Sequence, residues 1–233
     1  MQKFFVTGTD TEVGKTVVGS LLLNDLRSSY TRCQGFKPIA AGCHTTPNGR
    51  RNSDALSLQR ASTQEVAYDL VNPIAYDPAI APHIAAAEAR DEITLDRLQD
   101  ALDAIQATRP DLLVIEGAGG WRLPINDTQY LSQFVQQNQM PVIIVVGMRL
   151  GCLNHAVLTY ESVVYDGLPV VGWIANQCVE RMPYYDENVA TLTKMLDAPL
   201  LAEVAFQQTP SLQKHGAYKR LITWNCLSSL PER

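Results

Sequence analysis

The stretch that decides the fold reads Gly8-Thr-Asp-Thr-Glu-Val-Gly-Lys-Thr16. It follows the apolar run Phe4-Phe5-Val6 and precedes the largely apolar segment from Val17 to Leu23. A strand, a glycine-containing loop and a helix in this order bind phosphate, because the loop N–H groups face one concavity and the helix N-terminus adds its positive dipole. A chance Gly-Lys-Thr in a surface turn is the alternative, and this order of elements argues against it. The loop is one residue longer than the common form.

This loop predicts binding of a nucleoside triphosphate. Lys15 is predicted to reach the β- and γ-phosphates, and the Thr16 hydroxyl is predicted to bind Mg²⁺. The predicted nucleotide-binding residues of the loop are Gly8, Thr9, Asp10, Thr11, Glu12, Val13, Gly14, Lys15, Thr16 and Val17.

The overall composition is that of an acidic enzyme with a full hydrophobic core. The chain has 233 residues and a net charge of −5, which argues against nucleic acid or an anionic membrane as a partner. Its five cysteines never form a C-x-x-C pair, so we predict no disulfide framework and a cytoplasmic location. No apolar signal core opens the sequence, and the longest later apolar run, Val142 to Val146, is too short to span a bilayer.

Short apolar runs alternate with amphipathic stretches along the whole chain. This pattern predicts one α/β domain over residues 1–233, with a mostly parallel sheet, helices on both faces and a phosphate-loop NTPase-like organisation. The predicted strands are Lys3–Thr7, Gln34–Ile39, Leu112–Glu116, Pro141–Val146, Val170–Ala175 and Leu200–Val204. The predicted helices are Gly14–Ser28, Asp54–Ala61, Thr94–Thr108, Thr128–Gln137, Asn154–Asp166 and Asn188–Leu196, with a further helical part late in Val71–Ala89.

Polar residues and glycines stand where several predicted strands end. Open α/β sheets bind ligands at the carboxyl ends of their strands, so Lys37, Glu116, Gly147 and Asn176 are expected near the phosphate loop. Thr16, Asp54 and Glu116 are the predicted Mg²⁺ ligands, since Mg²⁺ binds hard oxygen donors. The alternatives are that Asp54 only caps a helix, as Asp127 would, and that Lys37 is a solvated surface charge.

These motifs together resemble the dethiobiotin synthetase family, and the resemblance covers nearly the whole chain. The extended phosphate loop is itself a mark of that family. The other matching segments are Gly35–Pro38, Arg51–Leu56, Val71–Pro73, Pro82–His83, Glu116–Gly120, Pro141–Gly147, Gly151–His155 and Gly172–Asn176.

The resemblance implies a ring closure that uses ATP, CO₂ and Mg²⁺ to convert 7,8-diaminononanoate into dethiobiotin. An amine captures CO₂ as a carbamate, the carbamate attacks the γ-phosphate, and the second amine closes the ring as phosphate leaves. By resemblance, Lys37, Lys15 and Thr11 act on the carbamate and the transferring phosphoryl group. The resemblance also implies that Asn176 contacts the adenine and that Gln177 belongs to the nucleotide-binding residues.

The resemblance also implies a homodimer whose diamine site lies at the subunit interface. The helix start at Gly151–Asn154 would receive the substrate carboxylate from the partner chain, and the alternative is that Asn154 simply caps the helix. The implied substrate-binding residues are Lys37, Ala41, Gly117, Ala118, Gly119, Gly151, Cys152, Leu153 and Asn154.

Three positions depart from the family pattern. Ala41 stands where serine is usual, Asn188 stands where some members have a tyrosine, for which Tyr184 or Tyr185 could substitute, and Ala205 replaces a proline near the adenine. A paralogue with an altered diamine substrate is therefore a second hypothesis. A third is an ATPase switch similar to ParA and MinD, although the chain lacks the early second lysine of those loops and an amphipathic C-terminal anchor. An amidoligase is excluded because 233 residues leave no room for a glutaminase domain.

Overall fold

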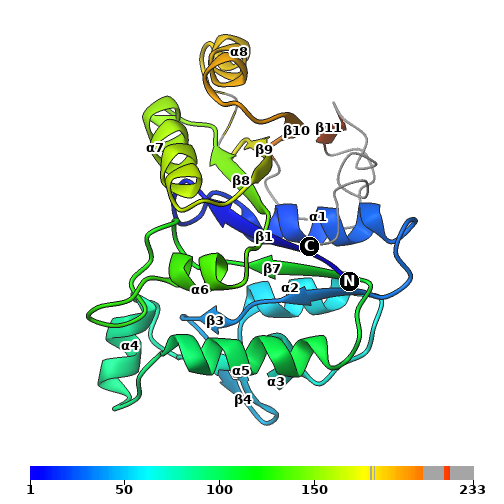
Figure 1. Ribbon diagram of the computed structural model, residues 1–233, viewed down its shortest axis with the longest axis vertical. Helices are drawn as coiled ribbons and strands as arrows, with labels where there is room; N and C mark the ends of the chain where they lie inside the picture. Colours follow the sequence, from blue (N-terminus) through cyan, green and yellow to red (C-terminus); the bar gives the residue numbers. More distant parts are fainter. Residues whose placement is uncertain (179, 181, 207–217, 221–233) are drawn as a thin grey trace.

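A central sheet lies between layers of helices in the computed structural model, which describes residues 1–178, 180, 182–206 and 218–220 (Figure 1). Cys226, one of the five cysteines, lies outside the described residues. The strands follow the order β11-β10-β9-β8-β1-β7-β2, and every neighbouring pair is parallel except β10 and β11. Their bounds are β1 Gln2–Gly8, β2 Cys33–Phe36, β7 Leu112–Glu116, β8 Val142–Gly147, β9 Val170–Asn176, β10 Leu200–Val204 and β11 Tyr218–Arg220. The predicted α/β class with a mostly parallel sheet is confirmed.

Both faces of the sheet are buried under helices. Along β7, Leu112 and Val114 pack with α1 and α2, whereas Leu113 and Ile115 pack into the core on the opposite face. This is why the central strands are continuous apolar runs rather than alternating ones. The helices are α1 Lys15–Leu26 and α2 Ser53–Ala61 on one face, and α5 Leu95–Gln106, α6 Leu131–Gln137, α7 Cys152–Tyr165 and α8 Tyr185–Met195 on the other.

Several short elements lie outside the main sheet. The parallel pair β3 (Ile39–Ala40) and β6 (Ile74–Ala75) and the hairpin β4 (His44–Thr46) with β5 (Gly49–Arg51) were not predicted from the sequence. The short helix α3 (Tyr68–Val71) was also missed, whereas the helical part expected late in Val71–Ala89 is α4, Pro82–Glu88. Within the described part of the chain, none of the helices is long and apolar enough to cross a bilayer.

Two predicted elements were wrong in their bounds because of local backbone bonding. The strand predicted over Gln34–Ile39 ends at Phe36, where the Lys37 N–H turns away to the Val71 carbonyl and Pro38 has no N–H to offer. The helix predicted from Thr128 begins at Leu131 instead. The side chain of Asn126 accepts the Thr128 N–H, and Tyr130 is the N-cap.

The N-caps of three other helices also differ from the sequence expectation. Asn52 caps α2, because its Oδ1 atom accepts from the N–H groups of Asp54 (3.0 Å) and Ala55 (3.2 Å), which leaves the Asp54 carboxylate out of the cap. Gly151 is the N-cap of α7, so Asn154 lies inside the first turn and the capping explanation for it is wrong. Helix α8 begins at Tyr185, before the predicted Asn188.

We expect Gly14→Ala to lower the free energy of unfolding more than the same substitution does at another glycine with positive φ. Gly14 has φ +89°, and a Cβ atom there would lie 2.1 Å from Asn176 Nδ2. The matched control is Gly167→Ala, because Gly167 has φ +76° and no atom of the described residues lies within 4 Å of the added Cβ. The control should lose about 1 kcal/mol through backbone strain, and Gly14→Ala should lose clearly more in urea unfolding. Equal losses would mean that Asn176 moves aside at no cost.

Candidate active site

A cavity of about 770 Å³ opens beside the phosphate loop and the ends of β2 and β7. This volume lies in the range of ordinary small-molecule pockets. One wall carries the charged groups of the loop and strand ends, and another is apolar. The lining residues are Thr11, Glu12, Gly14, Lys15, Thr16, Val17, Lys37, Ala40, Ala41, Asp54, Ala79, Ile80, Ala81, Pro82, Glu116, Ala118, Gly119 and Leu123.

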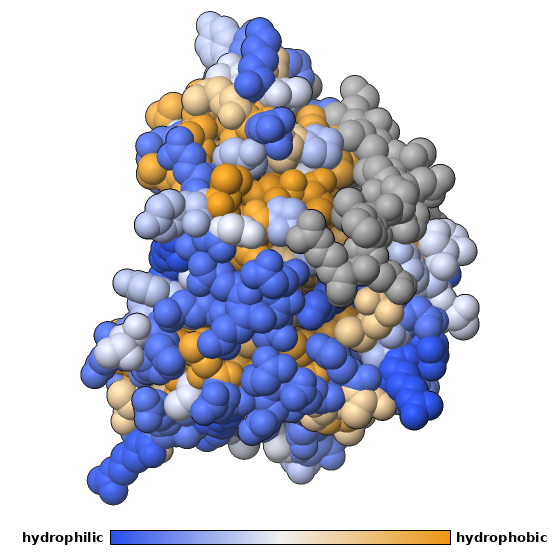
Figure 2. Space-filling model, viewed as in Figure 1, coloured by the Kyte–Doolittle hydropathy of each residue, from blue (hydrophilic) through white to orange (hydrophobic). Residues whose placement is uncertain are grey.

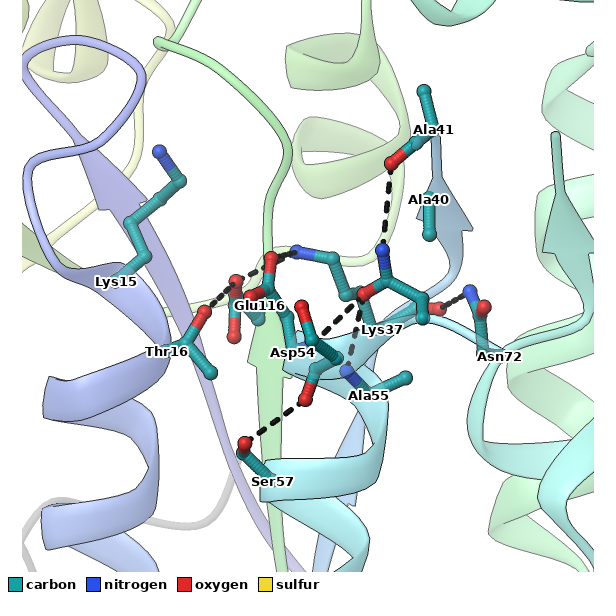
Figure 3. A network of polar contacts seen from close by, with 12 residues as sticks. Lys15, Thr16, Lys37, Ala40, Ala41, Asp54, Ala55, Ser57, Asn72 and Glu116 are labelled. Atoms are coloured by element: carbon teal, nitrogen blue, oxygen red, sulfur yellow. Dashed lines mark hydrogen bonds and ion pairs between the residues drawn. The ribbon is translucent and has the colours of Figure 1, made fainter. Parts of the chain in front are cut away.

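Lys15 is folded back onto the phosphate loop. It is the first residue of α1, it is 7% exposed, and its Nζ atom donates to the carbonyl of Asp10 (2.9 Å). Burial of the ammonium, together with the positive charge of Lys37, lowers the pKa of Lys15 to about 8. Figure 3 shows its side chain pointing away from Glu116 at the end of β7. An anion entering the loop would therefore meet a lysine that is already desolvated.

Lys37 is a buried ammonium held between two carboxylates (Figure 3). Its Nζ atom lies 2.6 Å from Glu116 Oε1 and 3.3 Å from Asp54 Oδ2, and its side chain is 5% exposed. Burial by itself would lower the pKa of Lys37, but the charges of Glu116 and Asp54 outweigh it and raise this pKa. Lys37 is thus a fixed positive charge inside the cavity, and its interpretation as a solvated surface lysine is wrong.

Two asparagines that sequence reasoning gave no role position this charge. Asn72 donates from Nδ2 to the Lys37 carbonyl (2.7 Å), and Asn52 holds α2 so that Asp54 projects toward Lys37. The hydroxyl of Tyr68 connects them, since it accepts from the Asn52 N–H and donates to the Asn72 side chain. Their only sequence signal was that both lie in segments matching the family pattern.

Thr16, Asp54 and Glu116 come together although they are far apart in sequence. The Thr16 hydroxyl donates to Glu116 Oε1 (2.8 Å), and Lys37 bridges Glu116 to Asp54. The second oxygen of Glu116 is buried and has no hydrogen-bond partner among the residues that the structure describes. A buried carboxylate oxygen with no partner, beside a hydroxyl and a second carboxylate, fits a hard cation such as Mg²⁺.

Other predicted residues do not line the cavity. Asn176, at the end of β9, is buried behind the phosphate loop and donates to the Val13 carbonyl (2.7 Å). Gln177 follows it and donates its N–H to the Val204 carbonyl. The helix start at residues 151–154 also lies outside the lining. The predicted residues not found in the lining are Gly8, Thr9, Asp10, Val13, Gly117, Gly151, Cys152, Leu153, Asn154, Asn176 and Gln177.

Sequence reasoning missed the apolar wall of the cavity. Ile80 and Leu123 line it, and neither belongs to a motif or a regular element. The segment of Ala79 to Pro82 is brought there by the β3–β6 pair, because Gly42 and Cys43 bond to the carbonyls of Pro78 and Tyr76. No local pattern in the sequence marked these side chains.

The fold and this site define a phosphate-loop nucleotide-binding protein. A family model described as an AAA domain matches residues 2–213. The ATP-dependent dethiobiotin synthetase of Aeromonas hydrophila is 52% identical over 90% of this chain and 93% of its own. That of Pseudoalteromonas translucida is 47% identical over 95% of this chain and 97% of its own. The chain belongs to the dethiobiotin synthetase family.

Solved structures at low identity share the fold alone. A MinC:MinD complex from Aquifex aeolicus matches with a TM-score of 0.57 and 12% identity, over 89% of this chain and 82% of that chain. Chloroplast FtsY from Physcomitrella patens matches with a TM-score of 0.50 and 12% identity, and this chain spans 64% of its length. These similarities agree with the mostly parallel sheet.

We expect Lys37→Met to destabilise the protein by about 3 kcal/mol, because it leaves Glu116 buried without its cation. Glu116 is 1% exposed. The double variant Lys37→Met with Glu116→Gln removes both charges and should recover most of that loss. Free energies of unfolding in urea measure both effects. The control is Arg32→Met, which breaks the exposed pair with Asp111 and should cost less than about 1 kcal/mol. A double variant no more stable than Lys37→Met would show that the pair is not the source of the loss.

Proposed function

We propose that the chain is an ATP-dependent dethiobiotin synthetase that closes the ureido ring on 7,8-diaminononanoate, with residues 1–233 acting as one cytoplasmic catalytic domain. The single observation that carries this proposal is the cavity in which a phosphate loop, a buried Lys37 ammonium and an apolar wall meet. Membership of the dethiobiotin synthetase family supports it. A nine-carbon diamine needs a cavity with charged groups for its carbamate and an apolar wall for its hydrocarbon chain.

The reaction builds negative charge at two successive stages. One amine of the substrate attacks CO₂ and loses a proton, which gives a carbamate. A carbamate oxygen attacks the γ-phosphorus and ADP leaves, which gives a carbamic–phosphoric anhydride. The second amine attacks the carbamoyl carbon and loses a proton, the bond to the phosphate oxygen breaks, and phosphate departs. The enzyme must therefore hold anions close together.

Lys37 is positioned to stabilise the carbamate and the transferring phosphoryl group. Its ammonium needs no reorganisation, because Glu116 and Asp54 hold it, and Asn72 holds the Lys37 backbone, before any substrate binds. Fixed charge of this kind lowers the barrier to phosphoryl transfer by several kcal/mol, about 2.7–4 where single donors have been removed. Lys37 lies near the ends of β2 and β7 and lines the same cavity as Thr11.

Lys15 is proposed to leave the Asp10 carbonyl and bind the β- and γ-phosphates when nucleotide enters. The phosphate charge then restores full protonation of an ammonium whose pKa burial has lowered to about 8. Thr16, Asp54 and Glu116 would hold Mg²⁺, which supplies charge neutralisation at the phosphate oxygens when bound. Asn176 is proposed to meet the adenine base from its place behind the loop.

The dimer remains part of the proposal and has one structural support. Leu150, Leu158 and Tyr165, on α7 and the loop before it, are 96%, 54% and 88% exposed. Figure 2 shows hydrophobic residues gathered in the upper half of that view, the region of α7, while the lower half is mostly hydrophilic. Apolar side chains of this size on one element favour a protein partner. A second copy of the chain would bring its Asn154, exposed in the first turn of α7, toward a substrate carboxylate.

The departures from the family pattern act on substrate fit in this proposal. Of the two tyrosines that could replace the one missing at Asn188, Tyr185 is 3% exposed in the core and Tyr184 is 76% exposed. Tyr184 is therefore the one that could reach a ligand. At Ala41 the site has a methyl group where the family pattern has a hydroxyl. The second candidate function is therefore the same ring closure on a different diamine substrate. Ala41 is the one residue that favours it.

Purified protein given ATP, Mg²⁺, bicarbonate and 7,8-diaminononanoate should form dethiobiotin, detected by mass, and should form none when any one of the four is omitted. We expect Lys37→Gln to lower kcat by 10²-fold or more, since it removes a charge used in the phosphoryl step. The matched control is Lys194→Gln on the exposed face of α8, which should keep wild-type kcat. Unchanged kcat in folded Lys37→Gln would remove Lys37 from the mechanism, and an absence of product from wild type would reject the proposed function.

Mixing a Lys15→Ala chain with an Asn154→Ala chain should restore activity if the site is shared between subunits. In each heterodimer, one of the two sites would then carry both lesions and the other neither. Subunit exchange is followed independently by native mass spectrometry of differently tagged chains. If exchange occurs and activity does not return, both residues serve the same chain and the shared site is rejected.

A further inference from the structure

The phosphate loop is hydrogen-bonded to the loop between β8 and α7, which carries no predicted catalytic group. Strands β1 and β8 are parallel neighbours, with Gly8 paired to Val145, so the loops that follow them lie side by side. The Thr9 N–H donates to the Val145 carbonyl (3.0 Å), and the Gly147 N–H donates to the Thr9 hydroxyl (3.4 Å). Beyond these bonds the second loop continues through Arg149 into α7.

Asp10 is the point where the two loops meet. Its Oδ2 atom accepts from the Arg149 guanidinium, its Oδ1 atom accepts from the Thr11 N–H (2.7 Å), and its carbonyl accepts from Lys15 (2.9 Å). One residue thus contacts the lysine of the phosphate loop, the backbone of that loop and the loop before α7. A change in the position of Lys15 therefore acts directly on the residue that holds Arg149.

The ion pair between Arg149 and Asp10 contributes little to stability. Both side chains are about two-fifths exposed, at 41% and 43%, and exposed pairs stabilise by only about 0–1 kcal/mol. Before Arg149 the loop between β8 and α7 is held by Met148, which is 1% exposed and donates its N–H to the Asn176 carbonyl (2.8 Å), whereas its exposed part begins at Arg149. Leu150 is 96% exposed, and at Gly151, with φ +94°, an added Cβ would have no atom of the described part of the chain within 4 Å. The pair consequently fixes position rather than fold.

We infer that Arg149 is a positioning residue that transmits the state of the phosphate loop to the start of α7. When phosphate draws Lys15 away, the Asp10 carbonyl is released and the Asp10–Thr11 peptide is free to turn. The Asp10 carboxylate then carries Arg149, and with it the N-terminal turn of α7, to a new position. Because this turn is proposed to bind the carboxylate of the diamine held by the partner subunit, nucleotide in one subunit and diamine in the other bind cooperatively. This last step rests on the proposed function.

Hydrogen exchange tests the transmission without any diamine. A non-hydrolysable ATP analogue with Mg²⁺ should increase protection of the amides in the first turn of α7, residues 152–156, in the wild-type protein. Arg149→Gln should lose this response, Arg149→Lys should retain it, and Asp10→Asn should lose it while keeping an acceptor for the Thr11 N–H. The matched control is Arg97→Gln, because the Arg97–Asp91 pair has nearly the same exposure, 40% and 39%. That variant should respond as wild type does.

Ligand coupling gives the second readout. In the wild type, saturating analogue should tighten binding of 7,8-diaminononanoate by about 5-fold or more, within the usual range of coupling between sites. In Arg149→Gln and Asp10→Asn the factor should fall below 2, and the double variant should lower it no further. The thermal unfolding midpoints of the two single variants should stay near the midpoint of the wild type. If one variant fails to fold, the other carries the test alone.

The role of Arg149 and the proposed function can be rejected by different outcomes. A wild-type α7 response that persists in Arg149→Gln or Asp10→Asn overturns the role of Arg149, whatever diamine binds. An α7 response that disappears in those variants, in a protein that binds no diamine, supports the transmission and rejects the proposed substrate. A wild-type protein whose α7 amides do not respond to the analogue overturns the inference directly.

Discussion

The buried ion pair between Lys37 and Glu116 organises the site. Removing both charges from water is costly, and the 2.6 Å contact offsets this together with the second carboxylate of Asp54 on Lys37 and the Thr16 hydroxyl on Glu116 Oε1. The pair joins the ends of β2 and β7, so it forms only when these strands are in register. The sheet thereby sets the position of a positive charge that no flexible surface lysine could keep.

The part of the site that the sequence predicted correctly is local or follows from sheet topology. Strand, glycine loop and helix marked the phosphate loop because these residues are contiguous. Glu116 could be placed near Thr16 because parallel strands end at one edge, and β1 and β7 are indeed neighbours. The role of Asp54 could not be decided from the sequence, because Asp and Asn are equally good caps, and only the structure showed that Asn52 caps the helix.

The part that could not be predicted depends on distant contacts between irregular segments. Ile80 and Leu123 reach the cavity through turns with no periodic pattern, and the β3–β6 pair that places Ile80 is too short to leave a signal. Arg149 stands between two segments that match the family pattern, two positions from each, and its partner Asp10 was interpreted only as part of the phosphate loop. Asn154 was assigned to a helix boundary that Gly151 occupies, because glycine caps leave no polar side chain to recognise.

The central claim is that the γ-phosphate is attacked by a carbamate oxygen within this cavity, and oxygen labelling tests it most directly. Wild-type protein is given ATP, Mg²⁺, the diamine and ¹⁸O-labelled bicarbonate in equilibrium with labelled CO₂, and the released phosphate is analysed by mass. Attack by the carbamate predicts one ¹⁸O atom in each phosphate formed, since the bridging oxygen leaves with phosphorus. Phosphate that carries no ¹⁸O from bicarbonate, and gains it from labelled water instead, would contradict the account and indicate simple ATP hydrolysis.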